Sequence, residues 1–287
     1  MSTSNAATGD HVVRAMTTDG AFRIVAVIAT RTADAAIAAQ AQWGDAGVQL
    51  AELIVAAAIV RETTQPARRV QIIWKQRDNN TLIADALPDG SNRGIVSIAP
   101  GNKTTLLQVN YTLPTGQLHQ GIIAMPDDLD TGTAIMQYMH QSEQSVTMVA
   151  VAAHRSDGSF ARVGGYLIQV LPEATPEATA ALVANLELLP AFDDILRSAD
   201  HARDIIAAMF LGLAHEELAH SELRFGCTCS ESRVIMGILT LDDDELRTII
   251  HGDMLDVRCD ACGTHYGIEP SAVRAMRDLR DRGAQPS

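Results

Sequence analysis

Four cysteines in the last quarter of the 287-residue chain have the type and spacing to do chemistry. They form a C-x-C pair, Cys227 and Cys229, and a C-x-x-C pair, Cys259 and Cys262, while the first 226 residues contain no cysteine. Two close thiol pairs, here separated by twenty-nine residues, can supply the four ligands of a tetrahedral zinc ion, two from each short loop. We therefore predict that the reduced protein binds one zinc ion per chain through these four thiolates.

The two cysteine pairs differ in their local sequence. The C-x-x-C pair has the form of a zinc knuckle between two short strands, in which Gly263 can adopt the positive φ that turns backbone N–H groups toward the thiolates. The C-x-C pair is unusual, because structural zinc sites usually separate paired ligands by two to four residues. Its sulfurs are close enough to oxidise to each other once the metal leaves. Spacing alone favours a static structural zinc over a redox switch, because most four-thiolate zinc sites are structural.

Other chemistries find less support in the sequence. Four thiolates leave no open coordination position, so a catalytic zinc is disfavoured. His265 follows Cys262 by three residues and is a candidate fifth ligand, but we expect it to be a solvated loop residue. The acidic run 242–245 is more typical of the first turn of a helix than of a cation site. Glu143 lacks a recognisable nucleophile and histidine at catalytic spacing, so we expect a turn or helix-end hydrogen bond there. The chain is predicted not to be an enzyme.

Composition excludes several partners and compartments. The formal net charge is −13, and residues 226–287 share this balance with eleven acidic side chains and seven arginines. Such a chain would repel nucleic acid and anionic membranes. Residues 1–20 lack the apolar core of a signal peptide, and the apolar run 50–60 is too short to cross a bilayer. Clustered cysteines at metal spacing also favour a reducing compartment, so we predict a cytoplasmic protein.

Residues 1–172 are predicted to form an α+β domain with a mixed, mostly antiparallel sheet and accompanying helices. We expect strands at residues 21–31, 70–74, 82–86, 94–98, 104–113, 121–124, 145–154 and 161–171, and helices at 33–41, 48–61 and 133–141. A polar turn is expected at Asp78–Asn80, between two of these strands.

Residues 173–225 are predicted to be a helical linker, and residues 226–287 a small zinc-binding module. Thr175 can cap a helix that begins at Pro176, and Asp200 can cap a second helix over 202–213. The linker is rich in large apolar side chains, which we expect to pack on the first domain in the resting state. The module has few such residues and should depend on its metal to fold. We expect it to contain a helix over 231–239, a second helix after Asp242, a hairpin over 257–268 and a last helix from Pro270.

Several short motifs, taken in order, resemble one known family. They are Arg93-Gly94, Gln120-Gly121, Gln141-Ser142-Glu143-Gln144, Gly164-Gly165 with Ile168-Gln169 and Leu171-Pro172, Phe225-Gly226-Cys227-Thr228-Cys229-Ser230, Arg258-Cys259-Asp260-Ala261-Cys262, and Tyr266. With four cysteines at the family spacing, the chain is similar over nearly its whole length to the bacterial redox-regulated thirty-three-kilodalton heat-shock chaperone, or holdase, family. It departs from the family pattern at His119, where a tyrosine is common, and in having only two lysines.

The resemblance implies a redox-regulated, ATP-independent molecular chaperone. The zinc-bound, reduced form would be inactive. Oxidation would release zinc and link Cys227 to Cys229 and Cys259 to Cys262, after which the module and the linker would lose structure. The exposed apolar surface would then bind unfolding client proteins, the chain would form a homodimer, and an ATP-driven chaperone would later take the clients. The alternative function is an interaction or accessory protein that carries a constitutive structural zinc module.

Overall fold

The computed structural model describes residues 9–64, 68–77, 80–98, 103–113 and 115–283. The chain divides into two compact units, Met1–Gly226 and Cys227–Ser287. The predicted fold class is confirmed, because each described unit combines helices with antiparallel strands. Residues 78 and 79 of the predicted polar turn lie outside the described residues. In the part of the chain that is described, no helix combines the length and the apolar character needed to cross a membrane.

The first unit contains two sheets and six helices among its described residues. One sheet has the strand order β11-β5-β4-β3-β6-β7 and the other has the order β10-β1-β2-β9-β8. All neighbouring strands are antiparallel except the short pair β11 and β5. The elements are β1 (His11–Thr17), β2 (Phe22–Ile28), α1 (Thr30–Gln40), α2 (Asp45–Thr63), β3 (Arg69–Lys75), β4 (Asn80–Ala86), β5 (Ser91–Ile98), β6 (Thr105–Thr112), β7 (Leu118–Met125), α3 (Thr131–Gln141), β8 (Thr147–Ser156), β9 (Ser159–Val170), α4 (Pro176–Glu187), α5 (Phe192–Ser198), α6 (Ala202–Met209), β10 (His215–Glu222) and β11 (Arg224–Phe225).

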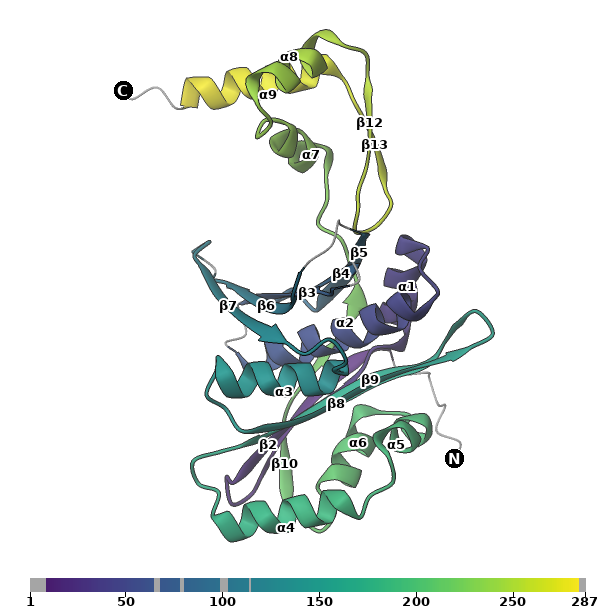
Figure 1. The fold of residues 1–287 in the computed structure, drawn as a ribbon, viewed down its shortest axis with the longest axis vertical. Helices are drawn as coiled ribbons and strands as arrows, with labels where there is room; N and C mark the ends of the chain where they lie inside the picture. Colours follow the sequence, from purple (N-terminus) through teal and green to yellow (C-terminus); the bar gives the residue numbers. More distant parts are fainter. Residues whose placement is uncertain (1–8, 65–67, 78–79, 99–102, 114, 284–287) are drawn as a thin grey trace, which may run out of the picture. The chain divides into compact units, whose positions relative to one another are not determined.

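Helix α2 lies between the two sheets and is buried on nearly every side from Leu50 to Glu62 (Figure 1). A helix that is apolar all round requires a buried environment of this kind. Two glycines of the motifs noted above let the sheets approach it. A Cβ atom added to Gly94 would lie 2.9 Å from a Leu50 methyl, and one added to Gly165 would lie 2.9 Å from a Val55 methyl. Glycine is therefore required at both positions by close packing.

Strand β2 is buried on both faces, and successive residues point to opposite sides of the sheet. Val25 and Val27 pack in the core that surrounds α2. Ile24 and Ile28 pack in a second core, under helices α4, α5 and α6, which cover the outer face of the five-stranded sheet (Figure 1). The first unit is thus four layers deep, and its outermost layer is made from the segment predicted to be a linker.

The linker segment, residues 173–225, is helical only in its first part. Thr175 caps α4 as predicted, with its side chain accepting a hydrogen bond from the Ala178 N–H at 3.1 Å. The cap of α6 is His201 rather than Asp200. Helix α5 was not expected, and the prediction of helix is wrong for residues 215–222, which form β10 at the edge of the five-stranded sheet. Its partner strand β1 was not predicted either, because no strand was expected in the polar residues 1–20.

Most of the large apolar side chains of this segment are covered. Six are buried and pack in the second core: Leu182, Leu196, Ile205, Ile206, Met209 and Phe210. Leu188 and Leu211 are the most exposed of them, at 85% and 66% of their accessible surface, and Val183 and Leu218 are exposed as well. The expectation that this segment packs on the first domain is therefore confirmed.

The second unit is small and has a correspondingly small core. Its described elements are α7 (Glu231–Ile238), α8 (Asp243–His251), β12 (Leu255–Arg258), β13 (His265–Ile268) and α9 (Pro270–Gly283). Its core is a cluster of seven buried apolar side chains, Ile235, Ile238, Leu239, Leu246, Ile250, Ile268 and Val273. The acidic run caps α8 as predicted, because Asp242 accepts hydrogen bonds from the N–H groups of Asp244 and Glu245. A core of this size supports the expectation that a metal is needed for folding.

Three histidines meet where α6 and β10 join β1. The rings of His11 and His201 lie 3.9 Å apart between centroids, and the His220 ring lies 5.4 Å from that of His11. His11 Nε2 accepts the N–H of Ala202 at 3.0 Å, so this contact requires a neutral ring. Burial is the main cause that lowers the pKa of both His11 and His201. Repulsion between the histidines and from Arg203 lowers the two pKa values further. Asp10 raises the pKa of His11 and Asp204 raises that of His201, while Glu217 forms an ion pair with Arg203.

We predict that acid loosens α6 and β10 from β1. Because the folded pKa of His11 and His201 lies below the unfolded value of about 6.5, their contribution to stability is complete above that pH and falls as the pH drops below it. Hydrogen exchange, corrected for the intrinsic effect of pH, should therefore show less protection of 202–209 and 215–222 at about pH 5.5 than at about pH 7.5. Helix α2 serves as the internal reference. His201→Ser, which keeps a helix cap, should weaken the pH dependence, and equal protection at both pH values would contradict the prediction.

Candidate metal centre

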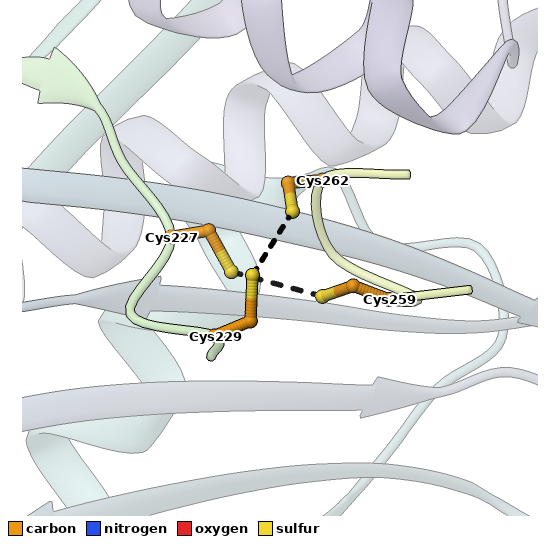
Figure 2. A group of neighbouring side chains, drawn as sticks. All are labelled: Cys227, Cys229, Cys259 and Cys262. Atoms are coloured by element: carbon orange, nitrogen blue, oxygen red, sulfur yellow. Dashed lines mark hydrogen bonds between the residues drawn. The ribbon is translucent and has the colours of Figure 1, made fainter. Parts of the chain in front are cut away.

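Two loops bring the four cysteine sulfurs together (Figure 2). Cys227 and Cys229 precede α7, whereas Cys259 and Cys262 lie in the turn between β12 and β13. All four sulfurs lie within 4.8 Å of one another. The Cys229 and Cys262 sulfurs are 3.3 Å apart, and those of Cys227 and Cys259 are 3.8 Å apart. The four residues predicted from spacing therefore form one cluster with the donor set of a metal centre.

The hairpin turn places its two sulfurs through backbone geometry. The Cys259 N–H donates to the Thr264 carbonyl and the Gly263 N–H donates to the Cys259 carbonyl, each at 2.8 Å. Gly263 has a φ of 74°, the left-handed conformation that glycine adopts most readily. A Cβ atom there would also meet the Arg258 guanidinium at 3.0 Å. The positive φ predicted for Gly263 is confirmed.

The C-x-C loop is fixed by the start of α7. The Ser230 side chain, next to Cys229, caps the helix by accepting the Arg233 N–H at 3.3 Å. The Arg233 guanidinium donates to the carbonyl of the spacer residue Thr228 at 2.8 Å. A side chain of α7 thus holds the backbone of the one-residue spacer, and the residue after the C-x-C pair caps the same helix.

Two hydroxyl groups of the hairpin contact the sulfurs, and sequence analysis assigned neither of them a role. The Tyr266 hydroxyl donates to the Cys229 sulfur at 3.0 Å, and the Thr264 hydroxyl lies 3.2 Å from the Cys262 sulfur. Residues 264 and 266 are separated by two positions, so their side chains share one face along the strand direction. Cys262, Thr264 and Tyr266 occupy every second position of the chain, and this spacing is the sequence signal that could have identified the two hydroxyl groups.

The thiols compete with one another for negative charge. Burial raises the pKa of the Cys262 thiol, but hydrogen bonds from Thr264 and the neighbouring thiols outweigh it and lower this pKa to about 6. The hydrogen bond from Tyr266 lowers the pKa of Cys229, whereas burial and the other thiols raise it to about 12. Burial is also the main cause that raises the pKa of Cys259. One sulfur therefore ionises readily while its neighbours resist a second negative charge close by.

A divalent cation would remove this conflict. Four thiolates around one zinc ion carry a net charge of −2 instead of −4, and zinc favours four sulfur ligands in a tetrahedral arrangement. The donor set and its compactness therefore fit zinc. Cys227, Cys229, Cys259 and Cys262 are the residues that would hold it.

The other candidate residues lie elsewhere or have structural roles. His265 is exposed and faces Asp256 at 3.2 Å, outside the sulfur cluster. The Glu143 carboxylate accepts hydrogen bonds from the hydroxyls of Tyr138 at 2.8 Å and Tyr111 at 3.1 Å. It therefore forms hydrogen bonds as expected, but one of them reaches β6 and is not the local turn or helix-end bond predicted.

Comparison with known proteins agrees with this architecture. The family model described as Hsp33 protein matches residues 10–269. The 33 kDa chaperonin of Syntrophotalea carbinolica is 26% identical over 285 residues, which cover 93% of this chain and 99% of that protein. The 33 kDa chaperonin of Geobacter sulfurreducens is 25% identical, with 94% of this chain and 95% of that protein covered.

A solved structure shows that the fold is shared as well. The crystal structure of the 33 kDa chaperonin, a heat shock protein 33 homolog, from Thermotoga maritima superposes with a TM-score of 0.80 at 16% identity. The match covers 96% of this chain and all of that one. Because the family model spans most of the sequence, including the sulfur cluster, the chain belongs to the Hsp33 protein family.

Proposed function

We propose that this protein is an ATP-independent holdase chaperone that oxidation of the sulfur cluster switches on. The observation that carries the proposal is the cluster itself, four sulfurs within 4.8 Å in a unit with few buried apolar side chains. The names of the relatives, 33 kDa chaperonin, support the chaperone class. In the reduced, cytoplasmic protein Cys227, Cys229, Cys259 and Cys262 would hold one zinc ion, and the chain would act as a chaperone and not as an enzyme.

The switching chemistry follows from thiolate reactivity. One thiolate attacks a peroxide, becomes a sulfenic acid and releases hydroxide. A second thiolate then attacks that sulfur, forms a disulfide and expels another hydroxide. Four thiolates thus reduce two peroxides and yield two disulfides. Disulfide sulfurs no longer carry the negative charge that holds a cation, so oxidation releases the zinc.

Loss of the metal should unfold the second unit. A structural zinc contributes on the order of 10 kcal/mol to folding, which is comparable with the whole stability of a typical domain. The seven side chains of this unit's core cluster cannot replace that contribution. The unfolded segment would stay dispersed in water because residues 226–287 are strongly acidic.

The proposed client surface lies beneath the outer layer of the first unit. We divide the chain functionally into a core domain, residues 1–172, a linker, residues 173–225, and the zinc module, residues 226–287. If the linker loosens after the module unfolds, the outer face of the five-stranded sheet loses its cover. That face carries Phe22, Ile24, Ile28 and Ile168, which are now buried under α4, α5 and α6. Unfolding clients would bind there, the oxidised chain would form a homodimer, and an ATP-driven chaperone would take the clients afterwards.

We predict that oxidation turns on suppression of client aggregation. Light scattering of a heat-unfolding client should rise freely with the reduced, zinc-loaded protein and be suppressed by an equimolar amount of the peroxide-treated protein. Reductant plus zinc should reverse the effect. A variant with all four cysteines changed to serine should suppress aggregation in either redox state, since it lacks the metal site. Strong suppression by the reduced protein would instead mean that the client surface is never covered, as in an accessory protein with a static zinc module.

We predict that the disulfides join neighbours, Cys227 with Cys229 and Cys259 with Cys262. In an unfolding module short loops close at the lowest entropic cost. The folded cluster favours the opposite pairing, because its two closest sulfur contacts link Cys229 with Cys262 and Cys227 with Cys259. Peptide mapping after peroxide treatment distinguishes the two. If most disulfides instead joined a cysteine of one loop to a cysteine of the other, oxidation would have been completed inside the folded cluster, contrary to the proposal.

A further inference from the structure

A second group of metal-ligand side chains lies in the first unit, far along the chain from the cysteines. His11 on β1, His201 at the cap of α6 and His220 on β10 bring one ring nitrogen each to within 4.8 Å of the others. The His201 and His220 ring centroids are 5.8 Å apart. Three imidazoles so close together form the type of donor set that binds zinc, nickel or copper.

The hydrogen bonds of His11 match those of a metal ligand. Its Nδ1 lies 2.7 Å from the Gly9 carbonyl, so this nitrogen carries the proton and Nε2 carries the lone pair. Imidazoles that bind metals usually donate their other N–H to a carbonyl or carboxylate, which fixes the tautomer and the ring orientation. The lone pair now accepts the Ala202 N–H, so metal binding would replace one backbone hydrogen bond.

His220 opens the cluster to solvent, and His201 adds a second neutral imidazole. His220 has an exposed side chain on the edge strand β10, from which a metal can enter. His201 Nδ1 accepts the Arg203 N–H at 3.1 Å, which also requires an unprotonated ring. Burial lowers the pKa of His11 and His201. Both rings are therefore unprotonated at neutral pH, and a metal ion would compete for ring nitrogens with the Ala202 and Arg203 N–H groups.

The charges around the cluster permit a cation. The Arg203 guanidinium lies nearby, but it is engaged by the Glu217 carboxylate at 2.6 and 2.9 Å. Asp10 and Asp204 act electrostatically on His11 and His201 with the opposite sign to Arg203. The acidic groups therefore offset the single arginine.

We propose that His11, His201 and His220 form a second metal site, for a divalent ion of the zinc class with water in the fourth position. The three ligands come from the core strand β1 and from the two parts of the linker, α6 and β10. A bound ion would fasten the linker to the core, so it would oppose the loosening described above. This site is independent of the cysteines, and its existence does not depend on the proposed function.

The test uses zinc alone and the reduced, full-length parent chain, whose sulfur site is first filled with zinc so that the linker stays packed on the core. Titration of further zinc against a chromophoric chelator should detect a second ion per chain. His220→Ala, at an exposed position, and His201→Ser, which keeps the helix cap, should each weaken binding by at least about tenfold. His140→Ala, an exposed histidine on α3, is the matched control and should bind as the parent does.

Hydrogen exchange gives a second readout. Zinc should increase the protection of 202–209 and 215–222 in the parent and in His140→Ala, and leave it unchanged in His220→Ala. Absence of a second bound zinc ion, or equal binding of it by His220→Ala and the parent, would overturn the proposal. Acid sensitivity of α6 and β10 without any effect of zinc would also overturn it, since the cluster would then respond to protons only.

Discussion

Four sulfurs held within 4.8 Å cannot all be thiolates unless a cation lies among them, and the second unit depends on this constraint. Like charges at such distances raise one another's pKa, as the opposite shifts of Cys229 and Cys262 show. The constraint also explains why one reaction can have a large structural effect. A metal ion would link the C-x-C loop to the C-x-x-C loop through the charged sulfurs. Any change that removes the charge of the sulfurs would therefore also break this link.

The first unit is built on a different basis, and we expect it to survive that loss. Its helix α2 is enclosed by two sheets, and the glycines at 94 and 165 allow contacts too close for any larger residue. The sulfur cluster takes no part in this packing, because it belongs to the other unit. The outer layer is more easily detached, since β10 lies at a sheet edge and α4 to α6 are short helices on one face. Under the proposed function, the core would stay folded while this outer layer detaches.

Sequence analysis predicted the elements whose local pattern matches their environment. The β-branched, apolar run of β2, the uninterrupted apolar run of α2 and the cysteine spacing each have one simple structural interpretation. Strand β10 does not, because its sequence, His-Glu-Glu-Leu-Ala-His-Ser-Glu, is acidic and mostly exposed and is held by backbone pairing with β1. The histidine cluster was equally out of reach, since 190 positions separate residues 11 and 201 and only the tertiary fold brings them together. Local sequence predicts local structure, whereas edge pairing and long-range clusters follow from topology.

The central claim is that the metal in the sulfur cluster keeps the second unit folded. It is tested most directly by following zinc release with a metal indicator and hydrogen exchange in the same peroxide time course. The account predicts one zinc released per chain, with protection of 231–283 lost at the same rate and protection of α2 retained. If the zinc left while 231–283 kept their protection, the metal would not hold this unit together and the account would be contradicted.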